Sequence, residues 1–272
     1  MPNVSEKVRL LGKGLYKTFP DEITIKTMPT VSELDYVASE DFDNVMLTKI
    51  LPECIEETGL NFDELLQYDY QWICRCLRFL NYGPYQNVNA IYCKECGPQY
   101  GDYQINLTSI ECNPLPEGFI NNIKISKDEF IDFNQDVTIK LLTMREVLNF
   151  EKDSAFKKKD GTVNRRLART CYMIKSIGTE TNLTPLDVKL KIEKEMSPAD
   201  FKILEEVIEE SSDYGLRAGG KCQCPKCKGE GTYIAFQDDR FFRPTLGNLR
   251  KWKDDKRQRR SEDAARNTAA NV

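Results

Sequence analysis

The sequence predicts an α+β fold: a helical body with short antiparallel strands that meet at a cysteine-rich site. Residues 69–81 carry apolar side chains at the spacing of one helix face. Residues 22–27 and 101–110 alternate apolar and polar side chains, as half-buried strands do. Two Cys-X-X-Cys motifs, each closely followed by glycine, stand beside predicted strands in distant parts of the chain. Helices, alternating strands and paired cysteines together favour this mixed fold.

The composition is typical of a soluble globular chain, and histidine is absent from it. The 272 residues are 40% hydrophobic and 30% charged, with a net charge of −4, which suits one or two domains. The absence of histidine excludes Ser-His-Asp and Cys-His catalysis, so we expect no enzyme. We find no apolar run that would span a membrane and no secretory leader. Ten cysteines in such a chain suit a reducing cytosol, where cysteine pairs favour metal binding over disulfides.

The N-terminal part of the chain is expected to begin with a free segment. Residues 1–20 show no periodic pattern, so we expect an N-terminal arm that lies on a partner or stays mobile. Residues 22–27 then predict a short strand. Residues 31–60 read as helical with an apolar stripe, and Pro52 should end or kink that helix.

Residues 69–81 form the clearest predicted helix, which the following Gly-Pro pair ends. We interpret Cys54, Cys74 and Cys76 as packing residues, because free cysteine behaves as a small hydrophobe. Cys74 and Cys76 are two positions apart on a helix and do not face each other, so they cannot share a metal.

A hairpin follows, in which residues 88–92 lead into the first cysteine motif and residues 101–110 lead out of it. Residues 120–125 and 136–141 predict a second pair of strands. A helical middle, residues 142–214, comes next, and three helix starts in it have N-cap hydroxyls: Thr143, Thr184 and Ser197.

The C-terminal part begins with the second cysteine motif and a short strand at residues 233–236. Phe241-Phe242 could dock into the body or into a partner. Residues 244–272 predict a basic C-terminal helix and a tail, with the helix over 245–260. The tail from Ser261 has few apolar residues, so we expect it to be disordered unless bound.

The two cysteine motifs predict one shared metal site. Each motif supplies two thiolates, and a structural zinc takes four ligands in a closed tetrahedron. We therefore expect a structural Zn²⁺ that joins the N- and C-terminal thirds and braces residues 21–243 as a single body. Its four ligands would be Cys93, Cys96, Cys224 and Cys227.

Two further cysteines stay open as ligands. Cys222 could replace Cys224, although Cys224 and Cys227 have the spacing that lets both sulfurs converge. Cys112 lies just beyond the first hairpin and is a fifth candidate.

The ordered set of motifs resembles the T-even bacteriophage baseplate hub (hub assembly) family. The resemblance runs from about Asp21 to Arg243, and its motifs follow in order. They are EITIKTMPTVSELDYVA, the helix ending in Cys54, LLQYDYQW, the Leu77-Arg78 stretch leading to Tyr82-Gly83, the first cysteine motif, DYQINLTSI, the second cysteine motif and Phe241-Phe242. The long basic C-terminal helix, the extra cysteines and the CQC at the second motif depart from the family.

The resemblance implies a non-enzymatic structural or assembly protein of a contractile phage tail. Its expected partners are the hub, spike and tape-measure proteins of the baseplate, reached through the N-terminal arm and the basic C-terminal helix. Its expected location is the host cytoplasm during assembly, with the tail baseplate of the virion as a second location.

A zinc-ribbon regulator that binds nucleic acid is the alternative. The segment RKWKDDKRQRR places Trp252 among cations, a combination that can stack on bases and contact phosphates. The net acidic charge argues against this reading, so we prefer an acidic protein partner for this helix.

Overall fold

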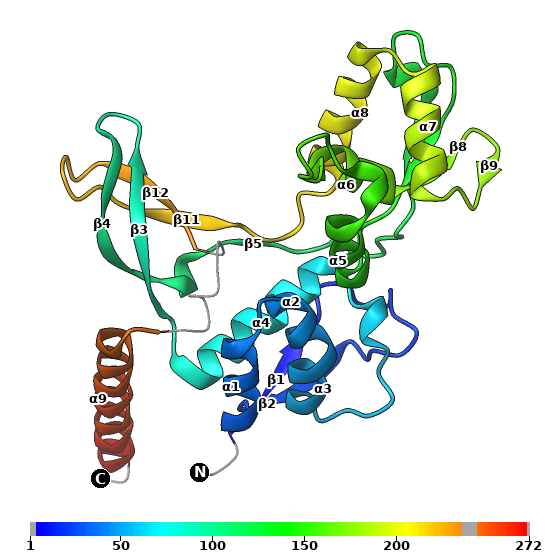
Figure 1. Cartoon of the computed structure of the whole chain (residues 1–272). Helices are drawn as coiled ribbons and strands as arrows, with labels where there is room; N and C mark the ends of the chain where they lie inside the picture. Colours follow the sequence, from blue (N-terminus) through cyan, green and yellow to red (C-terminus); the bar gives the residue numbers. More distant parts are fainter. Residues whose placement is uncertain (1–3, 236–243, 271–272) are drawn as a thin grey trace.

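The computed structural model describes residues 4–235 and 244–270, and it combines helices with antiparallel strands (Figure 1). Within these residues the strands form two four-stranded and two two-stranded sheets. The expected α+β class is therefore confirmed at this level. Figure 1 shows one helical lobe at the lower centre and another at the upper right, with the sheet that holds the cysteine motifs projecting to the left.

The first residues differ from the expected free arm. β1 (Ser5–Arg9) pairs antiparallel with β2 (Glu22–Lys26). Val8 and Leu10 are buried in the core. This stretch has few apolar side chains, and pairing with β2 rather than any periodic pattern sets its conformation. The segment predicted as an arm, residues 1–20, is thus part of the body from Ser5 onward.

The predicted helix over residues 31–60 is a series of short pieces. Pro52 has no N–H to donate, and it lies two residues after a π-helical turn that ends at Ile50, so the backbone irregularity lies close to where a kink was expected. Cys54 is fully buried, as predicted for a packing residue. The pieces are α1 (Thr30–Ala38), α2 (Phe42–Val45), η1 (Met46–Ile50) and α3 (Leu51–Cys54), followed by η2 (Phe62–Glu64).

α4 (Gln67–Tyr82) is the predicted central helix. Ile73 and Leu77 are fully buried, as their helical spacing predicted. Sequence reasoning missed that Arg78 is buried beside them. Its guanidinium donates to the carbonyl oxygens of Gly83 and Tyr85, so α4 is tied to the start of the following hairpin.

The projecting sheet combines two hairpins from distant parts of the chain, and we call it the finger. Its strand order is β11-β12-β3-β4, so β3 and β12 join the two hairpins at the middle (Figure 1). Its strands are β3 (Tyr85–Cys93), β4 (Gly97–Asn106), β11 (Gly219–Gln223) and β12 (Glu230–Ile234). β11 was not predicted, because its GGKCQ sequence has no apolar alternation.

The middle of the chain forms a second lobe of helices on a small antiparallel sheet. That sheet has the order β6-β7-β8-β9, and β5 pairs separately with β10. In the middle of the chain, the elements before α6 are η3 (Leu107–Ser109), β5 (Cys112–Asn113), β6 (Ile123–Ile125), η4 (Lys127–Glu129), β7 (Val137–Ile139), α5 (Met144–Lys152) and η5 (Ser154–Phe156). Those from α6 onward are α6 (Arg165–Met173), β8 (Ile174–Ile177), β9 (Glu180–Thr181), α7 (Pro185–Glu195), α8 (Pro198–Ser211) and β10 (Gly215–Leu216).

The three predicted N-caps are confirmed. Thr143 and Thr184 each form a complete capping box, with Glu146 and Asp187 respectively. Ser197 accepts the backbone N–H of Asp200 at the start of α8. Local hydrogen bonding of this kind is why these helix starts were readable from the sequence.

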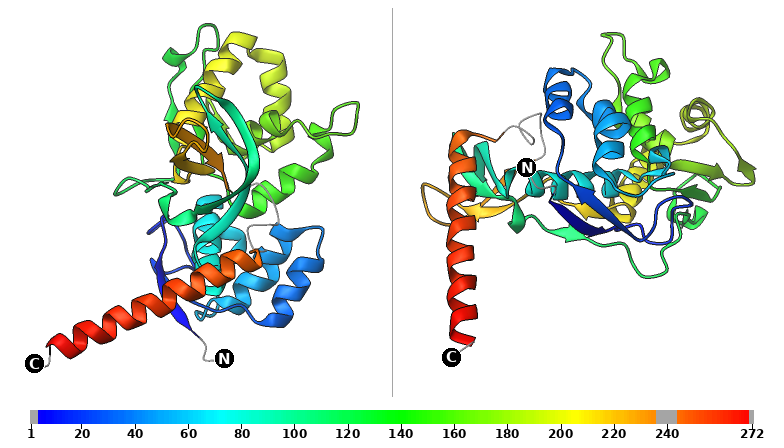
Figure 2. Two further views of the ribbon diagram at one scale, coloured as in Figure 1. Left: turned by 90° about the vertical axis from the view of Figure 1, so that its left-hand side faces the viewer. Right: turned by 90° about the horizontal axis from the view of Figure 1, so that it is seen from below.

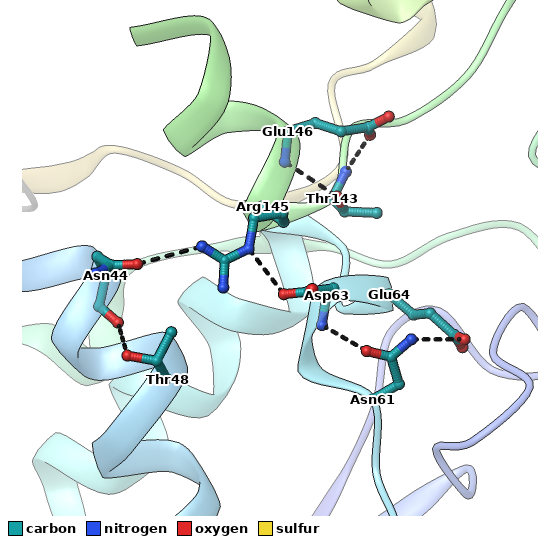
Figure 3. Close-up of polar contacts among 8 residues, drawn as sticks. All are labelled: Asn44, Thr48, Asn61, Asp63, Glu64, Thr143, Arg145 and Glu146. Carbon is teal, nitrogen blue, oxygen red and sulfur yellow. Dashed lines mark hydrogen bonds and ion pairs between the residues drawn. The ribbon is translucent and has the colours of Figure 1, made fainter. Parts of the chain in front are cut away.

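Arg145, on the first turn of α5, links the two lobes (Figure 3). Its Nε donates to Asp63 in η2 at 2.8 Å, and its Nη1 donates to Asn44 in α2 at 3.2 Å. Asn61 caps η2 and holds Asp63 in place through the Asp63 N–H. One forked side chain therefore bridges elements that lie 82 and 101 residues away in the chain.

α9 (Leu246–Ala270) is the predicted basic C-terminal helix, and it is longer than expected. It continues past Ser261, so the tail predicted as disordered is helical to Ala270. Successive turns can extend without a core because the segment has no proline or glycine after Gly247. Phe241-Phe242 lie outside the described residues. Among the described helices, none has both the length and the apolar character needed to cross a membrane.

Candidate metal centre

The first cysteine motif is the turn between β3 and β4. Cys93 ends β3, Gly97 begins β4, and the two residues pair across the ladder. Gly97 has a φ of +69°, a conformation that glycine adopts without steric cost. The turn therefore places Cys93 and Cys96 at the hairpin tip, as predicted from the sequence.

The second motif lies between β11 and β12. The Cys224 N–H donates to the Gly229 carbonyl at 2.8 Å, and the Lys228 N–H donates to the Cys224 carbonyl at 3.0 Å. Lys228 has a φ of +65°, which closes the turn. These bonds fold the chain back so that the Cys224 and Cys227 side chains lie at the tip of this hairpin.

The pairing of β12 with β3 brings the two tips together. Gly231 lies opposite Cys93, and Thr232 lies opposite Tyr92. The sulfurs of Cys93, Cys96, Cys224 and Cys227 lie within 4.8 Å of one another. The Sγ atoms of Cys93 and Cys227 are 3.6 Å apart. The four residues proposed from spacing alone therefore form one cluster that could bind a metal ion.

The cluster is graded in exposure from one side to the other. Cys93 and Cys224 are buried, Cys96 is half-buried and Cys227 is exposed. If one metal ion took all four sulfurs in a tetrahedron, no coordination position would remain for a substrate, which is typical of a structural site.

The electrostatics of the cluster suit a cation. The pKa of Cys224 is lowered to about 7, mainly because the backbone N–H groups of Cys227 and Lys226 donate toward its sulfur. The Gly229 N–H acts the same way on Cys227, yet its pKa is raised to about 12 because the sulfurs of Cys96, Cys93 and Cys224 lie beside it. Four adjacent thiols cannot all ionise alone, whereas a bound metal cation stabilises the thiolates.

The two alternative ligands lie outside the cluster. Cys222 sits on β11 opposite Gly231 and packs against the core, and Cys112 is in β5. Cys224, not Cys222, completes the set of four. Burial raises the pKa of Cys54, Cys76 and Cys171 to about 12, so these thiols stay protonated and serve as packing groups.

Sequence reasoning missed how α9 attaches beside this sheet. Trp252 packs against Gly83, where an added Cβ would lie 2.3 Å from the indole Cγ. The Tyr85 hydroxyl donates to Asp255, and Gln104 Nε2 donates to Asn248 Oδ1 at 2.6 Å. The only sequence signal was the position of Trp252 among cations, and it did not indicate which surface α9 packs against.

Comparisons of the chain with protein-family models, with curated proteins and with solved structures found no match.

Proposed function

We propose that the chain is a non-enzymatic structural or assembly protein of a contractile phage tail baseplate hub, braced by one structural Zn²⁺. The observation that carries the proposal is the four-cysteine cluster, which joins hairpins 134 residues apart. A metal bond there would join the two hairpins of the finger at their tips. A rigid body with projecting surfaces suits a part that docks into a larger assembly.

The choice of zinc rests on the spacing and chemistry of the sulfurs. With Zn–S bonds near 2.3 Å, the sulfurs of a tetrahedron are about 3.8 Å apart. The Cys93–Cys227 distance of 3.6 Å matches a single central ion. Iron–sulfur clusters also use four cysteines, but a multi-iron cluster would hold the sulfurs farther apart.

The assignment to a baseplate hub rests on the ordered motifs that resemble the hub assembly family. Two features of the chain suit such a role. The finger and α9 both project from the two lobes (Figures 1 and 2). Each offers a surface to neighbouring hub, spike or tape-measure proteins in the host cytoplasm or the finished baseplate.

The test is genetic and uses the phage that encodes this chain. Deleting the gene should give filled heads and tails that lack a hub, seen by electron microscopy. Complementation with the Cys222→Ser variant should restore infectivity, because Cys222 is outside the cluster. The Cys93→Ser variant should restore it poorly. Normal infectious particles after deletion would overturn the proposal.

A nucleic-acid-binding regulator remains the second candidate, because six cations of α9 are exposed: Arg250, Lys251, Lys253, Lys256, Arg257 and Arg259. A salt-dependent mobility shift of DNA or RNA would support it. The absence of any shift at low salt would remove it.

A further inference from the structure

α9 differs from the rest of the molecule in charge. Its 25 residues contain eight lysines and arginines and four acids, a net charge of +4. The whole chain carries −4, so the rest of it carries −8. Opposite charges on separate parts of one chain attract between copies as well as within one.

The contacts of α9 with the finger fix which of its faces points outward. Asn248, Trp252 and Asp255 contact Gln104, Gly83 and Tyr85, as described above. Lys251 lies over the Tyr85 ring, with its Nζ 4.2 Å from the ring centroid. These contacts occupy one side of the helix, so the opposite side faces away from the finger.

The outward side carries a basic stripe made of Arg250, Lys253 and Arg257. These residues lie at i, i+3 and i+7, which places them on one helix face. All three are exposed, and no ion pair to them occurs among the described residues. The sequence after Trp252 has no apolar residue until Ala264, so a partner of this stretch is recognised by charge.

α8 presents the complementary surface. Leu204 and Ile208 face the core, while Glu206, Glu209 and Glu210 are exposed on its outer side. Lys202 pairs with Glu206 at 3.1 Å, and in the described part of the chain no ion pair engages the other two glutamates. We call these three glutamates the acidic face.

The spacing of the two surfaces also matches. Glu206 and Glu210 are one helical turn apart, about 6 Å along the axis. Lys253 and Arg257 have the same separation, so two helices laid side by side pair both charges at once.

Within one molecule these surfaces cannot meet. α8 and α9 lie at opposite ends of the structure in all three views (Figures 1 and 2). A contact between the basic stripe and the acidic face therefore joins different copies. Such a contact is head-to-tail, and it produces a ring if its rotation closes.

We propose that α9 of one copy docks, through its basic stripe, on the acidic face of α8 in a second copy. The interaction goes beyond the proposed function, because it can hold whether or not the chain belongs to a phage tail. Exposed ion pairs are weak and screened by salt. The association is therefore concentration-dependent and salt-sensitive.

The first measurement is the mass of the full chain by light scattering after gel filtration, at about 0.1 M and about 1 M salt. We expect oligomers at the lower salt and monomers at the higher. If the chain is a monomer at both salt concentrations, up to the highest protein concentration reached, the proposal is overturned. A shift of a double-stranded DNA fragment by the same sample would then assign the basic stripe to nucleic acid instead.

Charge reversal separates a specific contact from general attraction. One variant carries R250E, K253E and R257E, and the other carries E206K, E209K and E210K. Each alone places like charges at the junction and should be monomeric at about 0.1 M salt. Their equimolar mixture should associate again, because each reversed helix then meets an oppositely charged face.

The matched control carries K157E, K158E and K159E, three exposed lysines in the turn after η5. It has the same net charge as the first variant and should associate like the original chain. Loss of association in this control, or no recovery in the mixture, contradicts the assigned surfaces. Circular dichroism and zinc content, unchanged in every variant, show that the body stays folded.

Discussion

Cys93 and Cys227 hold their sulfur atoms 3.6 Å apart, although 134 residues separate them in the chain. Among the described residues, the β-ladder between the two hairpins consists of two pairs, Gly231 with Cys93 and Thr232 with Tyr92. Two registered residue pairs are a weak join for two hairpins. A shared metal ion would give the finger the stability that its short central ladder lacks.

Removing the metal should loosen the finger and spare the helical lobes. We expect a chelator to speed amide hydrogen exchange in β3, β4, β11 and β12, because metal binding supplies folding free energy at such sites. α4 and α5 are held in the apolar core by Ile73, Leu77 and Leu148 and lie outside the finger, so their exchange should change little. Restoring zinc should restore protection, and uniform loosening of the whole chain would contradict this account.

Gly83→Ala should release α9 from the finger. The residue has a φ of +75°, and an added Cβ would lie 2.3 Å from Trp252 Cγ. With a ψ of −178° the backbone is in a region that essentially only glycine adopts, so strain alone costs about 1–3 kcal/mol, and the clash adds to it. Faster hydrogen exchange along α9 would show the release.

Gly59→Ala is the matched control, since Gly59 has a φ of +76° and no atom within 4 Å of the added Cβ. It should lower stability without changing exchange in α9. Equal exchange in both variants would mean that Trp252 packing does not hold the helix.

Asp69→Asn should destabilise the N-terminal segment that was expected to be a free arm. Asp69 is fully buried and accepts the N–H groups of Leu11 at 2.6 Å and Gly12 at 2.9 Å, together with the Tyr16 hydroxyl. An amide cannot accept all three, and a buried unpaired donor costs about 1–3 kcal/mol. Urea unfolding measures the loss, which should be absent from the exposed control Asp132→Asn.

The pKa of Asp69 also predicts in which direction the folding stability changes with pH. Burial raises the pKa of Asp69 above its usual value of 3.8, although bonds from Tyr16, Leu11 and Gly12 oppose the shift. The folded state then keeps this proton to higher pH than the unfolded chain does. The stability that Asp69 contributes therefore falls as the pH rises above 3.8 through the raised pKa.

The penalty of Asp69→Asn should accordingly be larger near pH 3.8 than near pH 8, in paired urea titrations. A penalty that grows with pH would contradict the direction of this shift.

Thr143→Ala should weaken α5 at its start. The Thr143 hydroxyl accepts the Glu146 N–H at 3.2 Å, and the Glu146 carboxylate accepts the Thr143 N–H at 3.0 Å (Figure 3). Loss of such a cap costs about 0.5–2 kcal/mol. Thr143→Ser keeps the hydroxyl and should restore most of the stability in thermal unfolding. Equal thermal stability of Thr143→Ala and Thr143→Ser would contradict a stabilising N-cap at this position.

The sequence was most informative where structure follows from local chemistry. Thr143, Thr184 and Ser197 cap helices through bonds to residues three positions on, which any reader of the sequence can find. The four-cysteine cluster was equally readable, because a Cys-X-X-Cys turn has a restricted geometry.

The missed features depend on partners distant in the chain. β1 contains only one buried side chain, Val8, and forms because β2 is available. Arg78 and Asp69 are charged residues whose burial is stabilised by backbone groups of other segments. Nothing in the sequence of α4 itself indicates those partners. Periodicity therefore predicted that both residues lie on α4, but not that they are buried.

The metal content of the purified chain, measured by mass spectrometry, tests the central claim most directly. We predict one zinc per chain, and an equal loss of zinc in Cys93→Ser and Cys227→Ser, which remove ligands from different hairpins. Cys222→Ser and Cys112→Ser should keep the full amount. Full zinc in either ligand variant, or no zinc in the original chain, would contradict a shared zinc site.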